Sequence, residues 1–310
     1  MAACAALVLV SGMAFAGTYR WDNDGVAPLS DGSGGWTASG GQNWFDGASS
    51  YGAWGNTVSD IAVFGVTNGA AGAIAVGTVN ANGITFNAPG SGAYTLSGGT
   101  ISLGGTTPTI TANTNAAIGS ALTGTSLTKT GTGTLTLSGK SLYSGNTTVN
   151  GGALKITGGI YTNAHSTSTV TIQTGGVLEL NTWAYGSSSE SLGMLAAEPE
   201  RIVVDSGTIR VNGSTSYGRG VTLNGPATLE AAAGANWVIN DTSYDRKDWR
   251  YNNKSIELAG AGTGTFEKGF SGSGGLTKNG LGTWILSGTN TYSGGTTVNA
   301  GVLRFAKTNS

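Results

Sequence analysis

The chain has 310 residues, a formal net charge of −1 and a charged fraction of 10%, against roughly 25% in an ordinary globular domain. It contains 55 glycines but only five prolines, which argues against a flexible glycine/proline linker and against disorder driven by charge. There is no excess of Lys and Arg to neutralise phosphates, so the composition argues against nucleic-acid binding.

The first element in chain order is a predicted signal peptide over residues 1–16. Residues 5–10 form a short apolar core, and Ala14-Phe15-Ala16 is an A-x-A cleavage site before Gly17. The core is too short to span a bilayer, and no Lys or Arg precedes it, so the true N-terminus stays open. A buried N-terminal strand or helix is the alternative. Cys4 is the single cysteine, so the mature chain is expected to have no disulfide and no Cys-ligated metal.

Residues 17–65 are rich in tryptophan. The four rings of Trp21, Trp36, Trp44 and Trp54 are expected to cap a repetitive fold, because the ends of a solenoid need covering; the alternative is a platform that binds sugars. Residues 22–25, Asp-Asn-Asp-Gly, resemble the opening of a calcium loop but lack the later bidentate glutamate, so we interpret them as a polar turn.

Residues 66–310 consist largely of short strands separated by glycine. Two segments, 127–156 and 276–305, align without a gap at an offset of 149, with 18 of 30 positions identical. A smaller unit, in which a Gly-containing corner precedes an alternating strand, recurs at 96–103, 149–156, 172–180, 204–211, 223–231 and 298–305. The period of two indicates half-buried β-strands, and no segment shows the 3.6-residue period of a helix.

Two architectures fit this pattern. Each Gly corner is either a tight hairpin turn in an antiparallel meander or a bend between two faces of one coil, with equivalent strands stacked in parallel. The strand before a corner often has only two apolar positions, so we predict the coil, an all-β, single-stranded parallel β-helix (β-solenoid). Each strand then pairs with its copy one turn away, at roughly 4.8 Å per rung. Glycine takes the positive-φ corner that a Cβ would obstruct.

The two long segments share five motifs. They are Leu-Thr-Lys at 127–129 and 276–278, Gly-x-Gly-Thr at 131–134 and 280–283, Leu-Ser-Gly at 137–139 and 286–288, Tyr-Ser-Gly at 143–145 and 292–294, and Thr-Thr-Val-Asn at 147–150 and 296–299. In these motifs both segments resemble the autotransporter-associated β-strand repeat, also called the passenger-associated transport repeat. Residues 21–64 resemble the tryptophan-rich segment that begins many such proteins.

The resemblance implies a right-handed β-helix, carried to the cell surface or beyond, often as a stalk or adhesin. It also implies that the repeat assists passage of the passenger and has no catalytic role. The residues alone do not fix the handedness. The chain stops at Ser310 without amphipathic barrel strands, so we expect a fragment that lacks a C-terminal translocator, or export by another route. Such an end would leave an unpaired rung, open to aggregation.

Two features of the middle of the chain are weak candidates for a site. His165, the sole histidine, is interpreted as an exposed loop residue, because a Ser-His-Asp triad would need it and no G-x-S-x-G elbow supplies the serine. An insertion over 183–200 contains Trp183 and Tyr185 and has acidic residues at its end, Glu198 and Glu200.

The most distinctive segment is 240–254, NDTSYDRKDWRYNNK, which concentrates charge in an otherwise nearly uncharged chain. It is expected to protrude as a loop between rungs, and loops on rigid scaffolds are where binding usually lies. Asp245, Trp249, Arg250 and Tyr251 are therefore the candidate ligand-binding residues, since an aromatic ring flanked by Arg and Asp can stack on a sugar and hydrogen-bond to it. The alternative is a solvated insertion that serves solubility.

Glycosidase chemistry would need two carboxylates held about 5–10 Å apart. Asp245 with Asp248, or Glu179 with Glu230 on neighbouring rungs, are the pairs that the sequence offers, without further support. No pattern indicates a catalytic residue, a metal site or a cofactor.

We therefore predict a signal peptide (1–16), a tryptophan-rich N-terminal cap (17–65) and a β-helix passenger (66–310). The predicted function is that of a secreted or cell-surface structural or adhesive passenger, with surface glycans or the surfaces of host or neighbouring cells as partners. It would meet the outer membrane only through the missing translocator. The alternatives are a β-helical polysaccharide lyase or hydrolase, and a carbohydrate-binding module centred on the tryptophan-rich start. The sequence does not identify the ligand.

Overall fold

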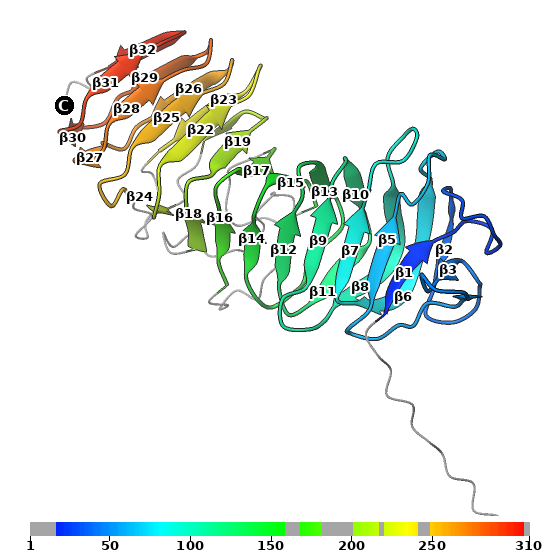
Figure 1. Ribbon diagram of the computed structural model, residues 1–310. Coiled ribbons are helices and arrows are strands. Elements are labelled where there is room, and N and C mark those ends of the chain that lie inside the picture. The colour runs from blue at the N-terminus through cyan, green and yellow to red at the C-terminus, as the bar shows by residue number, and fades with distance from the viewer. Residues whose placement is uncertain (1–16, 159–167, 182–200, 217–219, 241–248, 307–310) are drawn as a thin grey trace, which may run out of the picture.

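A computed structural model describes residues 17–158, 168–181, 201–216, 220–240 and 249–306, and these contain β-strands and no α-helix (Figure 1). Accordingly, no helix long and apolar enough to cross a membrane occurs in these ranges. The predicted signal peptide, His165, the 183–200 insertion and Asp245 with Asp248 lie outside the described residues.

The strands form two long sheets, a shorter third sheet and a two-stranded sheet. The 12-stranded first sheet contains β1 (Thr18–Trp21), β3 (Trp44–Phe45), β4 (Tyr51–Gly52), β5 (Ile61–Phe64), β7 (Gly83–Phe86), β9 (Thr109–Ala112), β12 (Leu127–Thr130), β14 (Thr147–Val149), β16 (Val170–Ile172), β18 (Ile202–Val204), β21 (Val221–Leu223) and β24 (Trp249–Arg250). The 13-stranded second sheet contains β2 (Gly34–Trp36), β6 (Ala73–Ala81), β8 (Thr95–Leu103), β10 (Ala116–Ile118), β11 (Ala121–Gly124), β13 (Thr134–Leu137), β15 (Gly152–Ile156), β17 (Gly176–Leu180), β19 (Thr208–Val211), β22 (Ala227–Ala231), β25 (Ile256–Ala259), β28 (Leu276–Lys278) and β31 (Thr296–Val298). The five-stranded third sheet contains β20 (Thr215–Ser216), β23 (Asn236–Ile239), β26 (Thr263–Phe266), β29 (Thr283–Leu286) and β32 (Val302–Phe305), while β27 (Ser271–Gly272) pairs with β30 (Thr291–Tyr292).

The pairing confirms the coil and excludes the meander. Most strands that follow each other along the solenoid lie in different sheets and pair in parallel with a strand one turn away. For example, Leu127 of β12 lies opposite Thr147 of β14, and Gly152 of β15 lies opposite Gly176 of β17. Among the described strands, only the β1–β3 and β3–β4 pairs are antiparallel, and both lie in the N-terminal segment. The chain is therefore a parallel β-solenoid, as its glycine corners and period-two strands predict.

The interior of the solenoid is built from columns of stacked apolar residues. Residues with inward side chains occupy matching positions in successive strands, as a fixed parallel register requires. The column through the first sheet runs Ile84, Ile110, Lys129, Val149, Ile172, Val204 and Leu223. Every member of this column is fully buried, including the lysine. One hydrophobic core extends from Trp21 to Leu286.

The tryptophan-rich segment closes the N-terminal end of this core. Trp21, Trp36, Trp44 and Trp54 are all buried, and the rings of Trp44 and Trp54 lie 4.8 Å apart between centroids. Three of the four rings also pack on Phe64 of β5, so the cluster continues directly into the first turns. Buried rings present no face to solvent, so the alternative of a sugar platform on these tryptophans is wrong.

The two long repeats occupy different faces of the rod. In the first repeat, the Leu-Thr-Lys strand β12 lies in the first sheet and the next strand, β13, in the second. In the second repeat the equivalent strands, β28 and β29, lie in the second and third sheets. The first sheet ends at β24, and Figure 1 shows the rod bending in this part of the chain. The two copies, 149 residues apart in the sequence, therefore lie on different faces of the solenoid. Each strand of the second copy lies one sheet further around the coil than its equivalent in the first copy.

Candidate functional site

A ladder of alternating charges crosses the outer face of the second sheet. Lys155, Glu179, Arg210 and Glu230 occupy matching positions on β15, β17, β19 and β22. Lys155 Nζ lies 2.9 Å from Glu179 Oε1, Arg210 Nη1 lies 3.3 Å from Glu179 Oε2, and Arg210 Nε lies 3.0 Å from Glu230 Oε1. The Asn212 amide donates a further hydrogen bond of 2.8 Å to Glu179 Oε1. Each carboxylate of the ladder thus faces a cation.

This ladder is not arranged as a pair of catalytic carboxylates. Burial alone would raise the pKa of Glu179, but hydrogen bonds from Lys155 and Asn212 and the charges of Lys155 and Arg210 bring that pKa below its ordinary value. A general acid needs a raised pKa instead. Glu179 and Glu230 are also not on neighbouring rungs, as the sequence suggested, because the rung of Arg210 separates them.

The distinctive segment before residue 254 is partly core and only partly surface. Trp249 and Tyr251 are buried: the Trp249 ring lies 5.2 Å from that of Phe266, and the Tyr251 hydroxyl donates to the carbonyl of Gly269 at 3.0 Å. Arg250 lies between them on β24 and is exposed. The expectation that both aromatic side chains protrude in a loop is therefore wrong, because their rings pack in the core of the solenoid. A binding role for Arg250, with Asp245 outside the described residues, stays a prediction.

The segment that resembles a calcium loop is a self-contained polar turn. Asp22 Oδ1 accepts hydrogen bonds from the backbone N–H of Asp24 at 3.2 Å and of Gly25 at 3.4 Å, and from the Ser30 hydroxyl at 2.8 Å. Gly25 has a φ of 71°, which favours glycine at this corner. In the described ranges, no three His, Cys, Asp or Glu side chains cluster as metal ligands would.

The lysine of each repeat performs a structural task that the sequence analysis missed. Lys129 is fully buried, and its Nζ donates hydrogen bonds of 3.0 Å to the carbonyl oxygens of Gly131 and Gly151. These two carbonyls belong to corners of successive turns, so one side chain joins both turns. Burial lowers the pKa of Lys129 to about 8.

The second repeat reproduces this arrangement. Lys278 is fully buried, and its Nζ donates to the carbonyl oxygens of Gly280 and of Ala300, the latter at 3.2 Å. Burial again lowers the pKa of the lysine. The sequence motif indicates that the lysine is buried. In a β-strand the Leu and the Lys of Leu-Thr-Lys point to the same face, and the Leu points inward.

A second contact shared by the two repeats pairs the tyrosine with a threonine. The Tyr143 hydroxyl lies 2.6 Å from Thr147 Oγ1, and the Tyr292 hydroxyl lies at the same distance from Thr296 Oγ1. Both pairs span one corner of the coil. The repeat motif therefore encodes the same corner contact in both copies.

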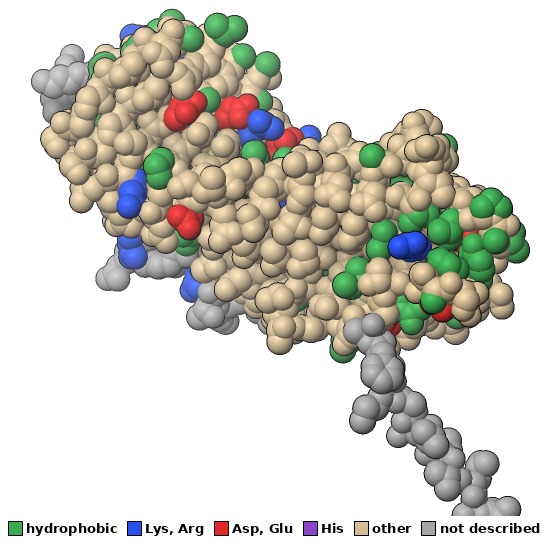
Figure 2. Space-filling view, in the orientation of Figure 1, with side chains coloured by type: hydrophobic (Ala, Val, Ile, Leu, Met, Phe, Trp, Pro, Cys, Tyr) green, Lys and Arg blue, Asp and Glu red, His purple; other side chains and the backbone are tan. Residues whose placement is uncertain are grey.

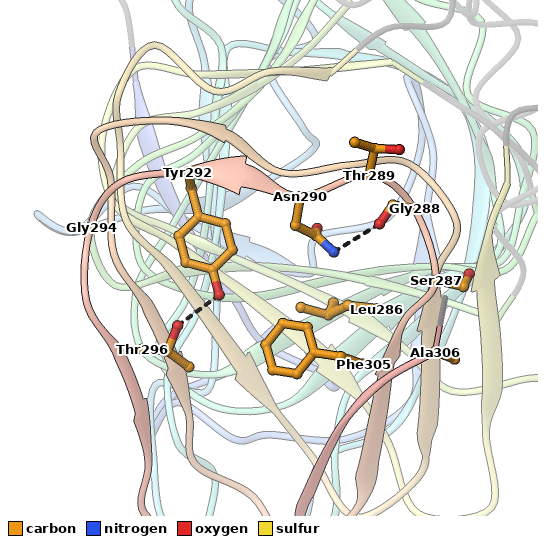
Figure 3. A pocket seen from close by; sticks show the side chains of 10 residues that line it. All are labelled: Leu286, Ser287, Gly288, Thr289, Asn290, Tyr292, Gly294, Thr296, Phe305 and Ala306. Atoms are coloured by element: carbon orange, nitrogen blue, oxygen red, sulfur yellow. Dashed lines mark hydrogen bonds between the residues drawn. The ribbon is translucent and has the colours of Figure 1, made fainter. Parts of the chain in front are cut away.

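A pocket of about 680 Å³ lies in the last described turn (Figure 3). Leu286 and Phe305 supply its apolar wall, and Phe305 is 57% exposed. Two of its polar side chains bond within the lining, since Tyr292 bonds to Thr296 and the Asn290 amide donates to the carbonyl of Gly288 at 2.9 Å. The lining residues all belong to the last two described turns of the coil, so the pocket lies at the end of the described core.

The comparisons with known proteins agree with this description of the repeats. The passenger-associated-transport-repeat family matches residues 127–156 and 276–305. The adhesin BmaC autotransporter of Brucella suis biovar 1 (strain 1330) is 40% identical over 158 residues, which are 48% of this chain and 4% of that protein. No solved structure matches the chain. Two segments of the chain thus match the passenger-associated transport repeat, and the chain spans a small fraction of the curated relative's length.

Proposed function

We propose that this chain is an exported, non-enzymatic passenger that forms a rigid adhesive stalk at the cell surface. The observation that supports this most strongly is the pair of passenger repeats, each of which contributes corner contacts to a continuous solenoid core. The similarity to an autotransporter named as an adhesin supports the adhesive role. Its partners are glycans on the surfaces of other cells, which the outward polar side chains of the rod can meet.

The absence of catalysis is part of the proposal. The acidic pair that the sequence offered on the described strands is neutralised within the charge ladder, and Glu179 has a lowered pKa. The side chains that the repeats add to the interior, Lys129 and Tyr143, are both fully buried. A polysaccharide lyase or hydrolase would need free acid and base groups facing a groove.

The proposal is tested by immobilising the full purified chain on beads and measuring bead attachment to cultured animal cells and to bacteria of another species. We expect saturable attachment that soluble chain competes for and that enzymatic removal of cell-surface glycans reduces. A heat-unfolded sample is the control for non-specific adsorption. Attachment no greater than that of the control would contradict adhesion, and release of reducing sugar from added polysaccharides would contradict the non-enzymatic assignment.

A further inference from the structure

A groove of about 530 Å³ lies on the outer face of the first sheet, close to its N-terminal end. Thr18 and Arg20 of β1, Val63 of β5, Thr85 of β7 and the neighbouring Asn87 line it. Its volume is in the range of about 300–1,000 Å³ that is typical of small-ligand sites, enough for one or two sugar units. Because these residues lie on paired parallel strands, the wall of the groove is held by the solenoid.

Arg20 is the group that sets this groove apart. It is exposed, and it is the only Lys or Arg among the first 128 residues of the sequence. None of the ion pairs found among the described residues includes it. Figure 2 shows a single blue side chain near the N-terminal end of the rod, surrounded by hydrophobic side chains. An unpaired guanidinium offers a planar fork of donors that matches a carboxylate.

The acidic side chains of this region are engaged by backbone N–H groups. Asp46 Oδ1 accepts from the backbone N–H groups of Ala48, Ser49 and Ser50, at 2.9 to 3.0 Å. Asp22 is bonded within the polar turn described above, and Asp31, Asp60 and Asp24 also accept hydrogen bonds from backbone N–H groups. These carboxylates are therefore held by backbone donors, while Arg20 keeps its donors for a ligand.

Two aromatic side chains extend the same face. Arg20 lies opposite Phe45 in the β1–β3 pair, and Phe45 lies opposite Tyr51 in the β3–β4 pair. Trp21 and Trp44 point inward, so Arg20 and Phe45, which alternate with them, point outward. The Phe45 and Tyr51 rings are half-buried, with centroids 5.1 Å apart. A half-exposed ring beside a polar groove can pack against the C–H face of a sugar.

We infer that this groove binds a carboxylate-bearing sugar of a surface glycan. Arg20 takes the carboxylate in a bidentate contact, Phe45 packs against the sugar ring, and Thr18, Thr85 and Asn87 hydrogen-bond to hydroxyl groups. Asn87 accepts one hydrogen bond from Asn113 with its oxygen, at 2.9 Å, which leaves its NH₂ group for the ligand. The inference rests on the proposed adhesive function and gives it a site. The carboxylate can come from a uronic acid or from a sialic acid, and the experiment separates these two sources.

The test measures binding of the full chain to fluorescent oligosaccharides that end in glucuronic acid, in sialic acid or in neutral galactose. We expect binding of one acidic probe at least, and a loss of about tenfold or more when its carboxylate is methyl-esterified, because a charge-assisted contact is removed. Arg20→Gln should cause a loss of the same size. Arg304→Gln removes one exposed cation from β32, far along the chain, and is the matched control that should keep wild-type affinity.

Val63→Trp provides an independent variant, because it fills the groove and leaves the guanidinium in place. It should also weaken binding of the acidic probe, while the far-ultraviolet circular dichroism of all variants stays that of the wild type. The inference is overturned if Arg20→Gln binds as tightly as Arg304→Gln, or if no acidic probe binds although beads coated with the chain still attach to cells. That last outcome would leave the adhesive function standing. If an acidic probe binds but beads coated with the chain do not attach to cells, the adhesive function alone is overturned.

Discussion

At the scale of single residues, the buried lysine is the unusual feature of the repeat. Lys129 stands in an inward column between Ile110 and Val149, where an aliphatic residue would be expected. An ammonium group in such a place costs desolvation energy, which explains its lowered pKa. The hydrogen bonds to two partly buried corner carbonyls offset that cost.

Replacing this lysine should therefore weaken the solenoid. Lys129→Met keeps most of the apolar stem but leaves the carbonyl groups of Gly131 and Gly151 without their donor, which should lower the free energy of unfolding by about 1–3 kcal/mol. Urea unfolding followed by circular dichroism measures the change. Arg304→Met, at an exposed position of the second repeat, is the control for loss of one charge. Equal effects of the two substitutions would contradict a role for the buried contact.

The same lysine predicts a dependence on pH. Its pKa is about 8 in the folded protein and 10.5 in the unfolded chain, so between these values the unfolded state binds more protons. Stability from this group must then rise with pH across that window, because the cost of burying the charge disappears. A neutral amine still has two N–H groups for the two carbonyls. The difference in unfolding free energy between wild type and Lys129→Met should thus be larger at pH 10 than at pH 7; a constant difference would refute this.

At the scale of the element, side-chain size is coordinated between neighbouring strands. Gly264 of β26 lies opposite Trp237 on one side and Trp284 on the other. The two tryptophan rings meet at 5.8 Å between centroids. A Cβ at Gly264 would lie 2.4 Å from the Trp284 ring, so the absent side chain makes room for the indole.

Gly264→Ala should consequently disturb the packing of Trp284 and destabilise the protein by about 1–3 kcal/mol, as overpacking of a core usually does. Near-ultraviolet circular dichroism and the thermal midpoint report this. Adding Trp284→Leu should restore much of the loss, because the first repeat has Leu135 at that position. Gly295→Ala, where no heavy atom lies near the added Cβ, is the control. If Trp284→Leu does not restore the stability lost in Gly264→Ala, a clash with the Trp284 ring is not the cause of that loss.

At the scale of the whole molecule, the coil was predictable because its information is local and repeated. Glycine corners and period-two strands such as Leu135-Thr136-Leu137 recur often enough to indicate parallel stacking. The change of face between the two long repeats was not predictable, because both copies have nearly the same sequence. It depends on the strands between them, because the third sheet begins at β20 and the first sheet ends at β24.

The site residues were harder to predict than the fold. The charges around Trp249 suggested a loop, although Trp249, Arg250 and Tyr251 alternate as buried, exposed and buried, which is the pattern of a strand. The charge ladder was hidden for a different reason. Its members are separated by 20 to 31 residues in the sequence, and only the register of the strands brings them together. No single segment of the sequence therefore indicates which charged residues become neighbours.

The parallel register itself admits a direct measurement. Thr109 and Thr222 lie in one outward column of the first sheet, which runs Thr109, Thr128, Thr148, Thr171, Val203 and Thr222. With Cys4 replaced, spin labels on cysteines at Thr109 and Thr222 can be measured by double electron–electron resonance. Five rungs of about 4.8 Å predict a separation of roughly 24 Å. An antiparallel meander would place β9 and β21 twelve strands apart, and a distance of roughly 58 Å would contradict the solenoid.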